Sequence, residues 1–156
     1  MIKFIDLFCG IGGFHLAMGG IKSKCVFASE WDKNCQDVYE KNFKIKPHGD
    51  ITNIDEKNIP KHDLLFAGFP CQAFSISGKR LGFDDARGTL FFDVARIIKF
   101  HNPKVVFLEN VKNFLKHDNG KTMRVVKSIL EELNYDVFFS ILNSAKYGVP
   151  QSRERI

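Results

Sequence analysis

One cysteine stands where an apolar run ends, and its type and setting suggest nucleophilic chemistry. The run from Leu64 to Ala67 is followed by Gly68-Phe69-Pro70-Cys71-Gln72. A thiolate is a strong nucleophile, but a free cysteine has a pKa of about 8.5, so Cys71 needs a nearby cation or a helix N-terminus to ionise at neutral pH. The common alternative for a Pro-Cys pair is a buried, inert thiol. The residue types alone do not choose between these two.

Charged residues that could assist such a nucleophile follow further along the chain. Glu109 comes directly after an apolar run at 104–108 and could donate a proton if burial raised its pKa. Arg153 and Arg155 lie two residues apart in an extended segment, so both point the same way and could bind a base carbonyl or phosphates. The alternatives are a surface acid and a solvated ion-pair cluster around Glu154.

A second group of residues has the features of a nucleoside pocket. The turn Gly10-Ile11-Gly12-Gly13 lets backbone amides approach a ligand. His15 stands where a dinucleotide fingerprint needs glycine, which disfavours a dinucleotide oxidoreductase. Glu30 could accept bonds from ribose hydroxyls, Trp31 could lie against adenine, and Asp50 could accept a bond from an exocyclic amine. A surface acid, a core tryptophan and a turn aspartate are the alternatives. Together these features suit S-adenosylmethionine.

The elements that must position these residues alternate between strands and helices. The predicted strands are Lys3–Phe8, Cys25–Ser29, a weak Lys44–Lys46, Asp63–Ala67, Lys104–Leu108 and Tyr135–Leu142. The predicted helices follow the glycine turn at 14–18, run from an Asp32 cap to Phe43, and span Thr89–Phe100 and Lys121–Leu133. Such alternation is typical of a parallel sheet that binds ligands at the carboxyl ends of its strands, where the residues above are found.

Length, composition and cysteine content limit the number of domains, the metal and disulfide content and the location that are expected. The 156 residues, 44% of them hydrophobic, are enough for one domain, and the net charge of +5 permits a polyanionic partner without requiring one. The four cysteines form no C-x-x-C pair and the five histidines are not at metal-ligand spacings, so neither a metal site nor a disulfide is predicted. We find no leader or membrane-length apolar segment and expect a cytoplasmic protein without membrane contact.

Six motifs, taken in order, resemble those of the cytosine-5 DNA methyltransferases, most closely the modification enzymes of bacterial restriction systems. They are Phe4 to Phe14 (FIDLFCGIGGF), Glu30-Trp31, Gly49-Asp50-Ile51, Gly68 to Gln72 (GFPCQ), Glu109-Asn110-Val111, and Gln151 to Arg155 (QSRER). The resemblance runs over essentially the whole chain. It favours the catalytic interpretation of Cys71, Glu109 and the two arginines.

The resemblance implies a Rossmann-like S-adenosylmethionine-dependent methyltransferase fold, with a mostly parallel sheet and helices on both faces. It implies methyl transfer to carbon 5 of a cytosine flipped out of double-stranded DNA. Cys71 would attack carbon 6, Glu109 would hold or protonate the ring nitrogen, and Arg153 and Arg155 would grip the base.

The resemblance also implies further binding residues. Those for the cofactor are Phe8, Gly10, Gly12, Gly13, Glu30, Trp31, Asp50, Ile51, Gly68, Pro70 and Leu90. The polar stretch 72–88 is too long for an ordinary connection and is predicted to be a mobile functional loop that closes over DNA. Its implied DNA-binding residues are Ser75, Ser77, Lys79, Arg80 and Arg87.

In the family, the last motif found here is followed by a further sheet strand, a target-recognition region and a final helix. We therefore expect residues 1–156 to form one incomplete catalytic and cofactor-binding domain, truncated before the last sheet strand. The chain is expected to be a truncation, an incomplete gene product or one half of a split enzyme, and in the last case its partner is a complementary C-terminal polypeptide. Two alternatives stay open: a tRNA cytosine-5 methyltransferase built on the same motifs, and a non-catalytic fragment or subunit that awaits its complement.

Overall fold

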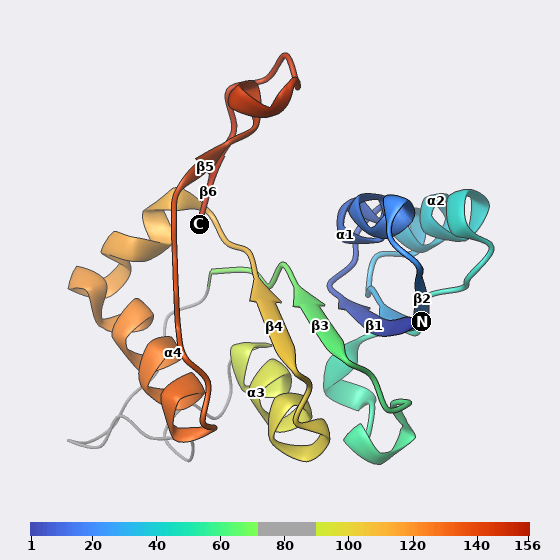
Figure 1. Ribbon diagram of the computed structural model, residues 1–156, viewed down its shortest axis with the longest axis horizontal. Helices are drawn as coiled ribbons and strands as arrows, with labels where there is room; N and C mark the ends of the chain where they lie inside the picture. The colour runs from blue at the N-terminus through green and yellow to red at the C-terminus, as the bar shows by residue number, and fades with distance from the viewer. Residues whose placement is uncertain (72–89) are drawn as a thin grey trace. The chain divides into compact units, whose positions relative to one another are not determined.

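The computed structural model describes residues 1–71 and 90–156, which fall into two compact units. The first unit comprises Met1–Gly68 and Arg96–Leu108, and the second comprises Phe69–Ala95 and Glu109–Ile156. Figure 1 shows the elements of both. Cys71 and Glu109 belong to the second unit, whereas the glycine turn, Glu30 and Asp50 belong to the first.

The first unit is built on a parallel sheet with the strand order β2-β1-β3-β4. The strands are β1 (Ile2–Leu7), β2 (Ser23–Ser29), β3 (Leu64–Ala67) and β4 (Val105–Leu108). Their last residues are register partners, since Leu7 pairs with both Ser29 and Ala67, and Ala67 pairs with Leu108. The predicted parallel sheet is confirmed, and its four carboxyl ends lie level at one edge.

Both faces of β1 are buried, which explains its nearly continuous apolar sequence. Phe4 faces α1 (Gly13–Ala17), where its ring meets that of His15 edge-on at 5.3 Å. On the same helix, Phe14 stacks on Phe66 of β3 at 5.0 Å and meets Phe107 of β4 at 5.7 Å. Aromatic packing therefore fixes this short helix. Figure 1 labels it α1.

The helix α2 (Lys33–Phe43) begins and ends as its sequence predicts. The Asp32 carboxylate accepts a bond from the Cys35 backbone amide at 3.0 Å and caps the first turn. Lys44 closes the helix in the left-handed conformation, with φ 58°. The predicted strand at 44–46 is wrong, because the left-handed conformation of Lys44 is incompatible with an extended strand. The next contact with the sheet is a single bridge between His48 and Ser29.

Beyond α2 the first unit continues through two single-turn 3-10 helices, η2 (Ile51–Asn53) and η3 (Glu56–Asn58), before β3. Of the helix α3 (Leu90–His101), the part from Arg96 onward belongs to this unit; it precedes β4 and carries the fully buried Ile97 and Ile98. β4 is the edge of this sheet within the described residues. Its Val105 and Phe107 side chains are about half exposed.

The second unit contains α4 (Lys121–Glu132), preceded by the 3-10 segment η5 (Lys112–Gly120). α4 has an apolar face of residues three and four apart, and all of them are buried: Val125, Val126, Ile129 and Leu130. A small antiparallel pair, β5 (Leu142–Asn143) with β6 (Glu154–Arg155), encloses the 3-10 turn η6 (Ser144–Tyr147).

The predicted strand Tyr135–Leu142 is wrong except for its last residue. Residues 135–141 form no strand, and the Phe138 side chain is 91% exposed. An alternating apolar pattern becomes a strand only when a neighbouring strand accepts and donates its backbone hydrogen bonds. Among the described residues no strand does so for this segment.

Candidate functional site

Three sequence motifs meet in the second unit through direct hydrogen bonds. The side chain of Asn110 is buried, and its amide donates to the Phe69 carbonyl oxygen at 2.7 Å. The backbone of Asn110 also exchanges two bonds with Ile156, at 2.8 and 3.0 Å. Asn110 therefore ties the segment before Cys71 to the end of the chain.

Glu109 is held by the third of these motifs. The Arg155 Nε lies 2.7 Å from the Glu109 carboxylate, and both side chains are partly buried. Val111 pairs with Arg155 in an antiparallel bridge, which keeps the two segments in register. Arg153, in contrast, is exposed, and its backbone amide donates to Asn143. The structure thus brings Arg155 to Glu109 but does not bring Arg153 there.

The segment before Cys71 is anchored by Phe69. The buried Phe69 ring packs against Phe91 at 5.4 Å and Phe114 at 5.8 Å. Cys71 itself is half-buried, and burial raises the pKa of its thiol. Since burial favours the protonated form, ionisation needs a cation or a proton acceptor. Residues of the stretch 72–88, where cations were predicted to serve this purpose, lie outside the described residues.

The glycine turn of the first unit has backbone conformations that favour glycine. Gly10 has φ 52° and Gly12 has φ 98°, and Phe8 precedes them with φ 54°. A Cβ on Gly12 would lie 2.1 Å from the Phe43 ring, so both conformation and space exclude a side chain there. At Gly10 and Gly13 a Cβ would meet nothing within 4 Å, which leaves open space beside the turn.

Glu30 joins this turn to the start of α2. Its two carboxylate oxygens accept bonds from the backbone amides of Gly10, at 2.9 Å, and Asp32, at 3.0 Å. Trp31 is 79% exposed, so the alternative of a core tryptophan is wrong. An exposed indole at the carboxyl end of β2 is suited to stack on a planar ligand.

The remaining predicted cofactor residues lie near strand ends. Asp50 is exposed and caps η2 by accepting a bond from the Thr52 amide at 2.9 Å. Ile51 beside it is buried. Gly68 follows β3 in the first unit, while the exposed Pro70 and the half-buried Leu90, the first residue of α3, belong to the second.

Comparison with known proteins identifies the family. The model of the C-5 cytosine-specific DNA methylases matches residues 2–156. The chain belongs to this family. It is 61% identical over 155 residues to the type II methyltransferase M.HhaI of Haemophilus parahaemolyticus and 55% identical over 156 residues to M.NgoBI of Neisseria gonorrhoeae.

The C-5 methylase chain spans about half the length of these relatives. The two alignments include 99% and 100% of this chain but 47% and 49% of the relatives. Among solved structures, a Spodoptera frugiperda DNMT2 variant superposes with a TM-score of 0.75 at 26% identity, covering 99% of this chain and 48% of that one. The S. pombe Dnmt2 methyltransferase, at 23% identity and a TM-score of 0.74, shares the fold, covering 99% of this chain and 49% of its own.

Asp6 is a buried residue that sequence reasoning missed. Its side chain is fully buried in β1, and neither carboxylate oxygen has a hydrogen-bond partner among the described residues. Burial raises its pKa to about 8; the backbone of His15 and the side chain of Tyr39 oppose this rise, and the charge of Glu30 adds a smaller increase. A lone acid within the apolar run Phe4 to Phe8 was the signal that could have found it.

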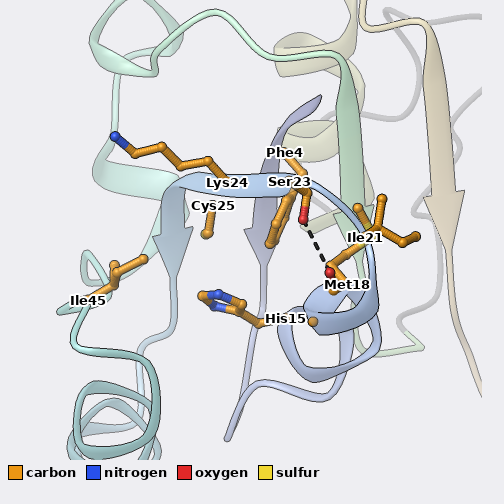
Figure 2. A pocket seen from close by; sticks show the side chains of 9 residues that line it. Phe4, His15, Met18, Ile21, Ser23, Lys24, Cys25 and Ile45 are labelled. Atoms are coloured by element: carbon orange, nitrogen blue, oxygen red, sulfur yellow. Dashed lines mark hydrogen bonds between the residues drawn. The ribbon is translucent and has the colours of Figure 1, made fainter. Parts of the chain in front are cut away.

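A pocket with a volume of about 290 Å³ also lies in the first unit (Figure 2). Phe4, His15, Cys25 and Ile45 line it, and Ser23 at its edge donates to the Met18 carbonyl oxygen at 3.2 Å. It borders the first half of β2 rather than the carboxyl edge of the sheet. It is therefore separate from the predicted cofactor residues.

Several predicted site residues cannot be placed. Ser75, Ser77, Lys79, Arg80 and Arg87 all lie outside the described residues. Within residues 1–71 and 90–156, no cluster of three metal-ligating side chains occurs. In the same ranges, no helix has the length and apolar character to cross a membrane.

Proposed function

We propose that this chain provides the catalytic and cofactor-binding half of a DNA cytosine-5 methyltransferase of a bacterial restriction-modification system. One set of contacts carries the proposal: Asn110 bonds the Phe69 carbonyl while its neighbour Glu109 pairs with Arg155. A nucleophile, an acid and an arginine from three distant motifs are thereby held in one compact unit.

The proposed reaction begins with attack of the Cys71 thiolate on carbon 6 of a flipped cytosine. A sulfur–carbon bond forms while the ring electrons move toward carbon 5, and the carboxyl group of Glu109 donates a hydrogen bond to the ring nitrogen, which limits the build-up of negative charge. Arg155 orients the Glu109 carboxyl group. After carbon 5 has accepted a methyl group it loses its proton to a base, and the returning electron pair expels Cys71.

The residues of the first unit fit S-adenosylmethionine, which supplies the methyl group when bound. Open space beside Gly10 and Gly13 admits a ligand against main-chain amides. The exposed Trp31 ring offers a surface for adenine, and the exposed Asp50 carboxylate offers an acceptor for its amine. Glu30 already accepts two amides, so a ribose hydroxyl would use its remaining lone pairs.

Double-stranded DNA and a second polypeptide are the proposed partners. The chain spans about half the length of the relatives it matches, with 47% of M.HhaI covered. In the second unit Phe138 and Phe139 are exposed, as Val105 and Phe107 are in the first, and a complementary C-terminal polypeptide would cover such apolar surface. A net charge of +5 suits DNA, and a bacterial DNA substrate implies a cytoplasmic location.

Trapping with 5-fluorocytosine tests the nucleophile. Duplex DNA containing this base is incubated with the chain and labelled cofactor, with and without the part of M.HhaI beyond the matched region as a separate polypeptide. Because fluorine cannot leave carbon 5 as a proton does, we expect a covalent protein–DNA adduct. Cys71→Ser should abolish it, whereas Cys35→Ser, at another half-buried cysteine, should not. An adduct that persists in Cys71→Ser would reject Cys71 as the nucleophile.

The same assay separates the alternatives. Methyl transfer to tRNA but not to duplex DNA would favour a tRNA cytosine-5 methyltransferase. Absence of an adduct and of methyl transfer to either nucleic acid, with the complementary polypeptide present, would favour a non-catalytic subunit.

A further inference from the structure

The segment that carries Asp50 has few sheet contacts to hold it. Before it, His48 makes two backbone bonds, donating to Ala28 of β2 at 2.8 Å and accepting from Glu30, the residue after β2, at 2.9 Å. The chain then runs through η2 and η3, single turns closed by local bonds such as that between Asp50 and the Thr52 amide. Single 3-10 turns are weak structures, so the position of Asp50 depends on contacts with other elements.

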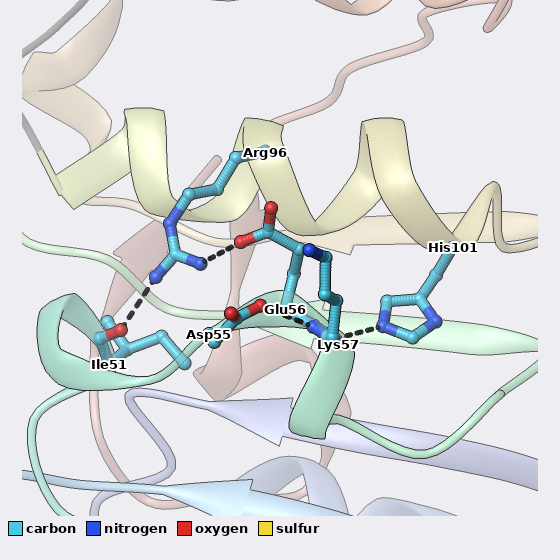
Figure 3. A network of polar contacts seen from close by, with 6 residues as sticks. All are labelled: Ile51, Asp55, Glu56, Lys57, Arg96 and His101. Carbon is cyan, nitrogen blue, oxygen red and sulfur yellow. Dashed lines mark hydrogen bonds and ion pairs between the residues drawn. The ribbon is translucent and has the colours of Figure 1, made fainter.

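Arg96 of α3 supplies two of these contacts (Figure 3). Its Nη2 donates to the Ile51 carbonyl oxygen at 2.8 Å, one residue after Asp50. Its Nη1 pairs with the Glu56 carboxylate at 2.7 Å. The two nitrogens of one planar group thus bind η2 and η3 at the same time.

His101, five residues after Arg96 in α3, adds a third contact. Its Nε2 lies 2.9 Å from the Glu56 carbonyl oxygen, so Nε2–H is the donor. All of these residues belong to the first unit. Because Arg96 is mostly buried, its charged hydrogen bonds compete less with water than those of a surface arginine.

We propose that Arg96 is a positioning residue for recognition of the cofactor's adenine. By holding the Ile51 carbonyl, with Glu56 fixing the guanidinium, Arg96 sets the place of the adjacent Asp50 carboxylate. Asp50 then discriminates an amine from an oxygen on the purine ring. This inference rests on the proposed function, since it assumes that Asp50 accepts a bond from that amine.

The geometry requires arginine in particular. A lysine has a single nitrogen and cannot reach a carbonyl and a carboxylate through a rigid fork. Arg96→Lys should therefore keep part of the anchoring, while Arg96→Met keeps only the aliphatic stem. Glu56→Gln retains a hydrogen-bond acceptor but removes the charge that fixes the guanidinium.

Calorimetric titration of the full chain with two neutral ligands tests the role. S-adenosylhomocysteine carries the 6-amine, and S-inosylhomocysteine carries oxygen in its place. The wild type should prefer the adenosine compound. In Arg96→Met we expect its Kd to rise about tenfold and the preference to fall toward equality, because a misplaced acceptor no longer distinguishes the rings. Arg96→Lys and Glu56→Gln should be intermediate.

Arg124→Met is the matched control, since Arg124 also donates to a backbone carbonyl, that of Asn119 at 3.3 Å, but in the second unit. It should bind both ligands as the wild type does. An unchanged Kd in Arg96→Met and Arg96→Lys, or equal losses for both ligands with the preference intact, would overturn the positioning role. Failure of the wild type to bind either ligand would instead reject the cofactor assignment, and the inference with it.

Discussion

Asn110 is a neutral residue that connects the segments carrying the proposed catalytic groups, Cys71 and Glu109. Its side chain reaches the carbonyl of Phe69, and its backbone pairs with Ile156. A buried amide that satisfies a buried carbonyl is costly to remove, because the partner is left without a hydrogen bond. Asn110 therefore stabilises the second unit and aligns the Cys71 segment with Glu109.

Asn110→Ala should slow adduct formation with 5-fluorocytosine DNA at least tenfold and lower the free energy of unfolding by about 1–3 kcal/mol. The reason is the unpaired Phe69 carbonyl. Urea denaturation and single-turnover trapping measure the two effects. Asn113→Ala, at an exposed position of η5, should change neither. Equal behaviour of the two variants would show that the Asn110 bond contributes nothing.

Asp6 should make stability depend on pH. Its pKa is about 8 in the folded state against 3.8 as the ordinary value, so between these pH values the folded state binds the extra proton. Stability is then lost as pH rises from about 4 to about 8, by at most about 1.4 kcal/mol per pH unit. Asp6→Asn removes this dependence.

The measurement is the urea midpoint of wild type and Asp6→Asn at pH 6, 7 and 8. The advantage of the Asp6→Asn variant should grow over this range and level off above pH 8. The charge of Asp6 also raises the pKa of Cys9, Cys25 and Tyr39, but these groups stay protonated between pH 6 and 8, so the difference isolates Asp6. A constant difference across the three pH values would mean that Asp6 is ionised in the folded protein.

At the scale of the elements, the turn between β1 and α1 is constrained in both backbone conformation and space. Gly12 combines a positive φ with a Cβ position that is filled by the Phe43 ring of α2. That ring also stacks on His15 at 4.0 Å, so it is not free to withdraw. The close approach of α2 to the turn is thus possible only with glycine.

Gly12→Ala should therefore lower the free energy of unfolding by about 2 kcal/mol or more, the sum of backbone strain and overpacking. Gly13→Ala is the control, because Gly13 starts α1 and has no atom within 4 Å of its Cβ position. Thermal and urea unfolding of both variants give the comparison. If Gly13→Ala is the more harmful substitution, the Phe43 contact does not limit this turn.

At the scale of the whole molecule, several large apolar side chains of the described residues are exposed. Phe138 and Phe139 are exposed in a segment that pairs with no described strand. β4 ends the four-stranded sheet and also exposes Phe107. Exposed apolar surface of this kind is suited to contact with another polypeptide, such as the complementary one proposed above.

Adding the M.HhaI polypeptide beyond the matched region should therefore protect the backbone amides of 105–108 and 135–141 from hydrogen exchange. Protection follows because backbone groups at a sheet edge gain partners when a strand is added. Mass spectrometry of peptides from both regions measures it. Peptides from α2, which is complete in this chain, are the internal control. Protection of α2 alone would argue against a complementary strand.

Sequence patterns anticipated much of this molecule because the relevant interactions are local. The Asp32 cap, the apolar face of α4 and the strands β1 to β4 follow from residue spacing and capping chemistry. The predicted strands were wrong at 44–46 and 135–141 because a strand requires a partner, which no single segment encodes. The order of six motifs was enough for the family, which the comparison confirmed.

The sequence by itself determined the family, the parallel sheet and the identity of the chemical groups, since these depend on residue types and periodicity. Only the tertiary structure decided which groups meet. It paired Arg155 rather than Arg153 with Glu109, exposed Trp31, and buried Asp6 without a partner. It also placed Arg96 on the segment of Asp50, 46 positions away in the sequence. Such contacts arise from packing between distant elements, which local patterns do not specify.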